Sequence, residues 1–248
     1  MKIMISNITL SLLFTVNAFP QGDIQKTGDS TATLLEKRSN LKLSTRIHSL
    51  GFFNYSGRIC TDNPAFDFTI SYDRKYWGVM TFSAIDMIDH QSDNNFSMTL
   101  IYTRIKLGKR VTIAPYTGFV LENLGKEKGD RHILITSLKV NPRIHLDHTM
   151  MFPNVFGKHD HDWVNRMRML CSVDNHLDFI FSVWHNNKVF DDAQYFSTAL
   201  NGAYNRIKVS KRVILNTGIT ALVMAETSDE KNFPKKNGIV FTLGAIID

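Results

Sequence analysis

Residues 195–224 read YFSTALNGAYNRIKVSKRVILNTGITALVM, and this stretch decides the fold. In its second half one face is apolar and carries Val213, Leu215, Ile219, Ala221 and Val223. The intervening residues are polar or small, and a repeat of two residues is the signature of a β-strand. The stretch therefore predicts two long antiparallel strands joined by a tight turn, each nearly long enough to cross a membrane.

The same alternation recurs along the rest of the chain, in stretches that begin at Leu41, Phe66, Phe96, Val111, Leu177 and Ile239. The connections alternate in length: short ones fall at 73–75, 107–109, 141–142, 174–175 and 210–211, and longer ones at 57–64, 89–94, 123–130, 153–162, 187–192 and 226–236. Counting the strands between them gives about twelve, an even number with short turns at one rim, as in outer-membrane barrels. The faces of 77–87 and 132–140 stay open because they alternate less cleanly.

Composition excludes two other classes of protein. The chain has 248 residues and a formal net charge of +6. Its basic residues are scattered over turns and loops without a Lys/Arg stripe, which argues against nucleic-acid binding. The mean hydropathy is slightly negative, and no long apolar run follows the N-terminus, which excludes a helical membrane protein. A barrel strand shows only half of its residues to lipid, so modest hydropathy fits a transmembrane barrel.

The N-terminus has the pattern of an export signal. Lys2 precedes an apolar core at 8–16, and small residues allow cleavage after Ala18. The expected organisation is a signal peptide at 1–18, a polar periplasmic segment at 19–40, and a barrel at 41–248 whose two ends lie at the periplasmic, short-turn rim. Cys60 and Cys171 fall near opposite ends of this barrel, too far apart for a disulfide, so we expect two free thiols.

Alternation alone does not say which face points inward, since a soluble lipocalin-like barrel buries its apolar face. The mid-strand polar face is rich in Ser, Thr, Asn, Gly and Tyr, whereas a water-facing exterior carries more Lys and Glu. Soluble barrels also usually close with about eight strands. We therefore expect the apolar faces, that of 96–102 included, to meet lipid. Aromatic residues near the strand ends are expected at the lipid–water boundary: Tyr72, Trp77, Trp163, Trp184 and Tyr195.

In layout the chain from 41 to 248 resembles the small outer-membrane β-barrel proteins of Gram-negative bacteria. The export signal, the alternating hairpins, the apolar last strand and the stretches FDFTISYDRKYWGVMTF (66–82) and DHQSDNNFSMTLIY (89–102) carry this resemblance. It implies a location in the bacterial outer membrane, with outer-membrane lipids and the barrel-insertion machinery as partners. Many such proteins end in an aromatic residue that this machinery reads. This chain ends Ile247-Asp248, so Phe241 is expected to serve less directly.

Four charged residues are the best candidates for a functional feature of the lumen. Arg166 and Arg168 lie on one face of a predicted strand, and a mid-strand arginine facing lipid costs about 2–4 kcal/mol. Asp147 on the preceding strand and Asp178 on the following one also face inward in the expected register. We predict an internal Arg–Asp ladder that braces the wall and narrows any passage. The alternative is a set of unpaired, hydrated arginines.

Motifs for metal binding and catalysis are weak. The loop 158–162 (KHDHD) and the stretch 89–95 (DHQSDNN) contain suitable ligands but lack a second ligand cluster or EF-hand spacing, so neither a metal nor a cofactor is predicted. His185 and Ser197, on adjacent strands, are the nearest approach to a hydrolase pair, and no third orienting group is evident.

The sequence thus predicts an all-β, closed, antiparallel up-and-down transmembrane barrel. Its expected function is that of a passive narrow channel or structural barrel. The alternatives are an outer-membrane lipid hydrolase and a soluble periplasmic barrel that binds an apolar ligand.

Overall fold

The computed structural model describes residues 41–53, 57–89, 95–122, 127–153, 155–156, 163–190, 193–231 and 235–247. The predicted signal peptide and N-terminal segment lie outside these residues. The described part of the chain contains no helix long and apolar enough to cross a membrane. Its strands are β1 (Leu41–His48), β2 (Gly51–Phe53), β3 (Arg58–Thr61), β4 (Ala65–Asp73), β5 (Trp77–Asp86), β6 (Phe96–Thr103), β7 (Ile105–Leu107), β8 (Val111–Glu122), β9 (Glu127–Lys139), β10 (Ile144–Pro153), β11 (Trp163–Ser172), β12 (Leu177–Phe190), β13 (Ala193–Lys208), β14 (Val213–Thr227) and β15 (Gly238–Ile247).

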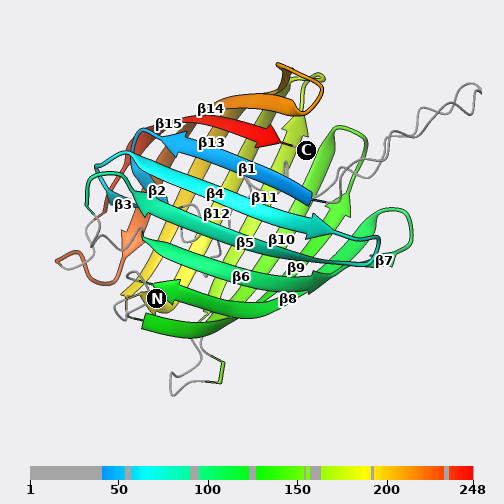
Figure 1. Ribbon diagram of the computed structural model, residues 1–248. Coiled ribbons are helices and arrows are strands. Elements are labelled where there is room, and N and C mark those ends of the chain that lie inside the picture. Colours follow the sequence, from blue (N-terminus) through cyan, green and yellow to red (C-terminus); the bar gives the residue numbers. More distant parts are fainter. Residues whose placement is uncertain are drawn as a thin grey trace, which may run out of the picture.

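All strands except β2 and β3 belong to one antiparallel sheet that closes into a barrel (Figure 1). β1 pairs with both β15 and β4, which joins the two ends of the chain. β6 and β7 pair with the same strand, β8, and β7 continues the line of β6. The ring therefore has twelve strands, and the predicted up-and-down barrel is confirmed.

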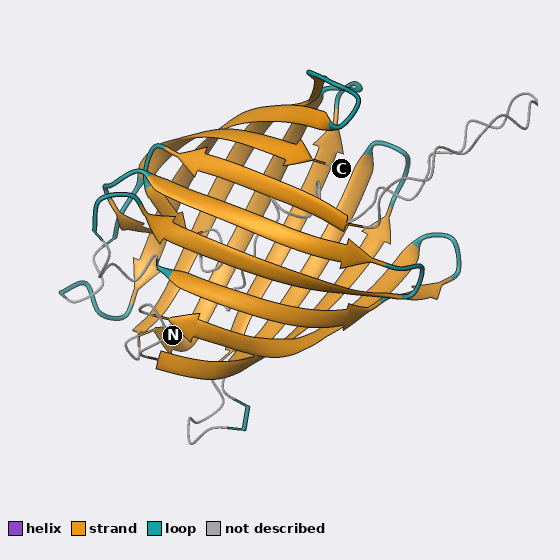
Figure 2. Ribbon diagram, viewed as in Figure 1, coloured by secondary structure: helices purple, strands orange, loops and turns teal. Residues whose placement is uncertain are grey.

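Short turns gather at the rim where β1 begins and β15 ends, and this rim faces right in Figure 2. Two connections at the opposite rim differ from the prediction. β12 runs to Phe190 and β13 starts at Ala193, and β9 already starts at Glu127. Much of the expected loops 187–192 and 123–130 is therefore strand. Backbone pairing continues beyond the apolar section of these strands, where polar side chains had indicated a loop.

A small hairpin, β2–β3, is inserted between the neighbouring strands β1 and β4. Its residue Ile59 packs in a buried cluster with Leu222 and Val240, which occupy buried, inward-facing positions on β14 and β15. Cys60 packs against a second cluster formed by inward-facing residues of β5, β6 and β8 to β11. The β2–β3 hairpin therefore folds into the barrel and lies against its inner wall.

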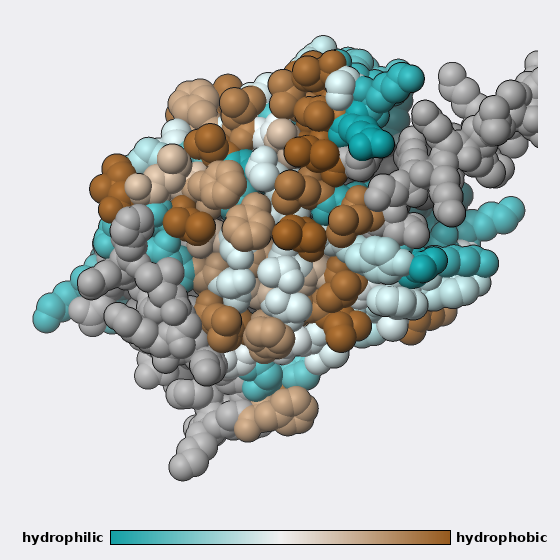
Figure 3. Space-filling model, in the orientation of Figure 1, coloured by the Kyte–Doolittle hydropathy of each residue, from teal (hydrophilic) through white to brown (hydrophobic). Residues whose placement is uncertain are grey.

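The outer surface of the ring is largely apolar. Large side chains on five different strands are about half exposed, namely Ile47, Ile101, Phe119, Leu200 and Leu243. Figure 3 shows apolar side chains spread over the face formed by β1, β4, β5 and β6, interrupted by a lighter group of intermediate hydropathy. An exterior of this kind is suited to acyl chains rather than to water.

The inner surface has two unlike halves, and here one expectation is wrong. Charged and polar residues line β1 and β4, but β5, β6 and β8 to β11 enclose an apolar cluster. On β6 the apolar face points inward and the hydroxyl face outward, the reverse of the prediction for 96–102. The outward hydroxyls pair across β5 and β6, with oxygen–oxygen distances of 3.1 Å for Thr81–Thr99 and 2.9 Å for Ser83–Ser97. This pairing satisfies the hydroxyls and makes their exposure to lipid tolerable.

The aromatic residues divide in the same way. Tyr72 and Trp77 lie on the outer face near the short-turn rim, with ring centroids 6.1 Å apart. Trp184 and Tyr195 are each 2% exposed and point inward, so their prediction as membrane-boundary residues is wrong. Proximity to a strand end does not determine the face. Both cysteines are free thiols, with Cys60 inside the barrel and Cys171 near the short-turn rim.

Candidate functional site in the barrel lumen

One buried network links β1, β4 and β15. Arg46 donates from Nε and Nη2 to the two carboxylate oxygens of Asp67, at 3.0 and 2.7 Å. The ring of His48 bridges Asp67 Oδ2 and Thr242 Oγ1, with both distances 2.9 Å. Arg46 and Asp67 are directly paired in the β1–β4 register, so the two-pronged contact is built into the wall. The result is a fixed polar rib on the inside of the barrel.

The four residues predicted for the ladder all lie on the inner face. Arg168 is paired with Asp147, with Nη2 at 2.7 Å and Nε at 3.2 Å from Asp147 Oδ2. Arg166 instead donates from Nη2 to the neutral hydroxyl of Thr149, at 3.2 Å. The structure therefore brings one predicted arginine to one predicted aspartate and gives the other arginine a neutral partner.

Asp178 binds groups nearer the short-turn rim. It accepts hydrogen bonds from Ser172 Oγ at 2.6 Å, Asn205 Nδ2 at 2.8 Å and Arg206 Nη2 at 2.7 Å. Arg206 lies in a bulge of β13 and has a left-handed backbone, with φ of 64°. Its N–H donates to Asn216 Oδ1 at 3.0 Å, which helps to hold this unfavourable conformation.

Another carboxylate lies at the short-turn end of the apolar half. Asp73 accepts hydrogen bonds from the Tyr102 hydroxyl and from Arg104. The Tyr102 ring stacks on Tyr116, with centroids 4.6 Å apart. Aromatic surface and a charged pair thus meet at this mouth of the barrel.

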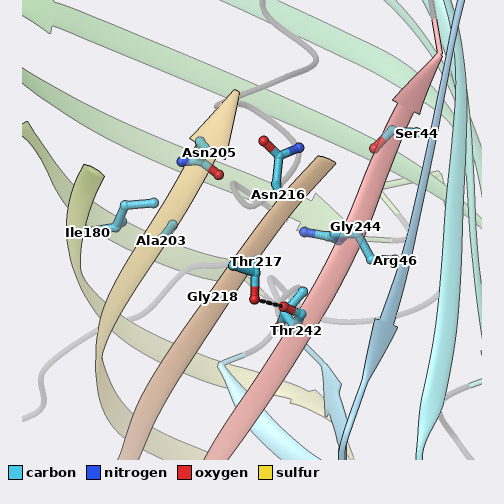
Figure 4. Close-up of a pocket in the computed structure, with 10 residues that line it drawn as sticks. All are labelled: Ser44, Arg46, Ile180, Ala203, Asn205, Asn216, Thr217, Gly218, Thr242 and Gly244. Atoms are coloured by element: carbon cyan, nitrogen blue, oxygen red, sulfur yellow. Dashed lines mark hydrogen bonds between the residues drawn. The ribbon is translucent and has the colours of Figure 1, made fainter. Parts of the chain in front are cut away.

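A narrow cavity lies in the polar half, between β1 and the strands β12 to β15 (Figure 4). It measures about 20 Å³, which is room for about one water molecule. The side chains of Arg46, Asn205 and Asn216 line it, and the Thr217 hydroxyl donates to the Thr242 carbonyl at 3.2 Å. Such a cavity suits a single water molecule.

The β2–β3 hairpin closely approaches the inner wall at Gly57. A Cβ atom there would lie 2.5 Å from Trp184 Cδ2 and 2.7 Å from Ser197 Oγ, and the φ of 67° also favours glycine. Ile59, farther along the hairpin, packs in one cluster with Trp184 and Leu222. The hairpin therefore narrows the lumen beside these residues.

The structure separates the other candidate residues. His185 packs edge-on against Trp163 on the outer face, whereas Ser197 points inward, so the two do not form a hydrolase pair. His148 points outward to Asn165, away from Asp147. The loop 158–162 and most of 89–95 lie outside the described residues. No group of three potential metal ligands occurs in the part of the chain that is described.

Sequence reasoning missed the Arg46–Asp67–His48 network. The β2–β3 insertion separates β1 from β4, so nothing in the sequence shows that these residues are cross-strand neighbours. Arg206 was also missed, because the bulge in β13 changes the register there. The one available signal was that Arg46 and His48 share a face of their strand. That face points inward if the apolar residues between them meet lipid.

No family model matches the sequence, and the search of curated proteins finds no match either. The structure is similar to that of the porin NanC, with a TM-score of 0.53 and 10% identity over 84% of this chain and 99% of that one. OccD1 (OprD) gives a TM-score of 0.42 and 10% identity over 84% of this chain and 65% of that one. The monoaromatic hydrocarbon channel CymD gives 0.42 and 8% identity over 84% and 87%. From its closed ring and its likeness to NanC, the chain has the fold of an outer-membrane porin barrel.

Proposed function

We propose that this protein is a passive channel of the bacterial outer membrane with a narrow lumen. The observation that carries the proposal is the sorting of side chains across a closed wall. Ile101, Phe119 and Leu243 are exposed on the outside, whereas Arg46, Asp67 and Arg168 are buried on the inside. A closed ring leaves no unpaired strand edge in the lipid, and a charged interior gives water and polar solutes a path.

Within this proposal the short-turn rim faces the periplasm and the long-loop rim faces outward. The lipids of the outer membrane contact the apolar exterior, and the barrel-insertion machinery assembles the chain. The β2–β3 hairpin and the polar rib formed by Arg46, Asp67 and His48 set the width of the passage, which makes the channel selective for small solutes. Arginine and aspartate side chains on adjacent strands, such as Arg168 and Asp147, brace the wall of the proposed channel.

The two alternatives have less support. A lipid hydrolase needs a nucleophile with a base in reach, and His185 and Ser197 lie on opposite faces of the wall. A soluble barrel needs a water-compatible exterior, and the outside here carries large exposed apolar side chains on many strands. Fractionation of cells into periplasmic extract and detergent-solubilised outer membrane distinguishes the soluble barrel from the channel and the lipid hydrolase, which would both be found in the membrane fraction.

The channel itself is tested by conductance in planar bilayers. We expect small, stable steps for the intact protein and larger steps for a variant in which residues 51–61 are replaced by a short turn. β1 and β4 pair along their whole length without the hairpin, so the ring is expected to remain closed in this variant. Equal conductance for the two proteins, or none for either in well-folded samples, would contradict the proposal.

A further inference from the structure

An open groove of about 520 Å³ lies at the short-turn rim, between the turn that joins β9 to β10 and the turn that joins β11 to β12. Pro142, Ile144, Cys171 and Val173 supply its apolar lining, and Arg143 is the charged residue that lines it. The cavity in the polar half of the lumen, by comparison, has room for about one water molecule. The groove is therefore large enough to hold part of an organic ligand.

The apolar lining belongs to the outer, lipid-facing side of the wall. Ile144 and Cys171 are directly paired in the β10–β11 register, so they share a face of the sheet. Cys171 lies on the same face of β11 as Met169, which is 43% exposed, and it pairs with Phe179, which is 42% exposed. Val173, at the end of the groove, is 46% exposed. The groove therefore continues the apolar exterior of the barrel up to the short-turn rim.

The rim around the groove is strongly basic. Of the five short turns in the described residues, four carry exposed lysine or arginine side chains, among them Arg74, Lys109, Arg143 and Lys211. The remaining turn carries an exposed carboxylate, Asp174, whose Oδ1 accepts the backbone N–H groups of His176 and Leu177 at 2.6 and 2.7 Å. This carboxylate is held within its own turn, and the excess of positive charge attracts anionic groups to the rim.

The guanidinium of Arg143 is available to an external partner. The backbone N–H of Arg143 donates to Asn141 Oδ1 at 2.8 Å, which orders the turn, whereas its exposed side chain makes no ion pair within the described part of the chain. Cations of this rim also reach the lipid side, since Arg74 Cζ lies 5.3 Å from the ring centroid of Tyr72 on the outer face. A guanidinium matches the geometry of a phosphate group, to which it can donate two hydrogen bonds.

We propose that this groove binds one anionic phospholipid of the periplasmic leaflet. Arg143 donates to the phosphate, and the first part of an acyl chain lies against Ile144, Cys171 and Val173. An acidic protein would be attracted to the same cations, but it would leave a lipid-facing groove uncovered, so the apolar lining favours a lipid. The inference rests on the proposed function, because it needs the short-turn rim to lie at the periplasmic surface of the membrane.

The test uses Cys171 as a reporter, because its thiol lines the groove. The full-length protein in dodecyl maltoside micelles is titrated with dioleoyl phosphatidylglycerol, which is anionic, or with dioleoyl phosphatidylcholine, which is zwitterionic and has the same chains. Alkylation by N-ethylmaleimide is followed by mass spectrometry of each cysteine peptide. We expect half-maximal protection of Cys171 at about fivefold less phosphatidylglycerol than phosphatidylcholine, the factor that one arginine contributes near anionic lipid. Cys60, inside the barrel, is the internal reference and is expected to react at a rate that neither lipid changes.

Arg143→Gln is expected to abolish the preference for phosphatidylglycerol. Lys211→Gln is the matched control, because it removes an exposed cation from another short turn outside the groove, and it should leave the preference unchanged. Loss of the preference in Lys211→Gln would show general attraction to the rim and overturn the site. All variants are first checked for the compact, heat-sensitive gel band of a folded barrel.

Three other results also overturn the site. They are equal protection of Cys171 by the two lipids, protection by neither, and a preference that survives Arg143→Gln. Glycerol 3-phosphate, which has the charged group but no acyl chain, is expected to give no protection at the concentrations at which the lipid protects. Equal protection by this compound would show that the groove takes a free phosphate ester rather than a lipid.

Protection in micelles does not require an open pore, so the two proposals can fail separately. A preference for phosphatidylglycerol without conductance in bilayers would leave the lipid site in place and remove the channel. Conductance without this preference would leave the channel and remove the lipid site.

Discussion

Asp67→Asn is expected to destabilise the barrel more than any change at an exposed ion pair. Asp67 accepts three hydrogen bonds, two from Arg46 and one from His48, and all three residues are less than a tenth exposed. Asparagine has the same size and keeps one acceptor oxygen, but it lacks the negative charge. The change therefore removes the carboxylate charge that is paired with the buried Arg46 guanidinium.

The magnitude follows from that loss. Breaking a buried ion pair by removing one partner costs about 3–5 kcal/mol. The retained amide oxygen and any water in the lumen place this case at the low end, at about 3 kcal/mol of the free energy of unfolding. Asp62→Asn is the control, because Asp62 pairs with Lys236 at 2.9 Å but its side chain is 77% exposed. Exposed pairs contribute about 0–1 kcal/mol.

Urea titrations of the protein folded into lipid vesicles measure both changes. The slope of unfolding free energy against urea must stay constant, so that a midpoint shift reports stability. The two variants are compared in vesicles of the same lipid. If Asp67→Asn proves no more destabilising than Asp62→Asn, the polar rib does not stabilise the wall and the reasoning is refuted.

Three further changes test other parts of the structure. Gly57→Val places a branched side chain against the indole ring of Trp184 and forces a left-handed backbone on valine, so the hairpin is displaced. Trypsin is then expected to cleave after the buried Arg58 faster than in the parent protein, and unchanged protection would contradict the packing of the hairpin on the wall. Arg206→Gly is expected to be more stable than Arg206→Ala by about 1 kcal/mol in urea unfolding, because only alanine keeps the cost of positive φ; equal stabilities would argue against the bulge. Asp147→Asn and Asp178→Asn are each expected to lower the melting temperature. Their changes in the free energy of unfolding add in the double variant to within about 0.5 kcal/mol, because their hydrogen-bond partners differ. Strong coupling between the two changes would instead indicate a continuous Arg–Asp ladder.

Alternation predicted the faces of most strands but not of all. Phe66, Phe68 and Ile70 on β4 point outward as expected, because their neighbours are charged or hydroxyl-bearing and only one face can meet lipid. On β6 the pattern is equally regular, yet its direction is reversed. The interior is apolar on that side, and short hydroxyl side chains can pair with one another at the surface. The two-residue period does not say which face of a strand points inward. For these strands the answer depends on which residues they pack against in the folded barrel.

The candidate site was predictable only in part. Arg166 and Arg168 were placed inside because an arginine in lipid is costly, and the structure has both on the inner face. Arg168 contacts Asp147 and Arg166 contacts Thr149 because these residues are directly paired in the β10–β11 register. Asp178 instead pairs with Arg206 at a bulge in β13, which has no clear mark in the sequence.

The β2–β3 insertion has a consequence for how such a protein can diversify. It enters and leaves between two strands that pair along their full length regardless of what it contains. Its composition can therefore change from one lineage to the next while the cylinder, its thickness and its insertion into the bilayer stay as they are. In the proposed channel, selectivity would then reside in a short, exchangeable segment, and the scaffold around it would be free to be inherited intact.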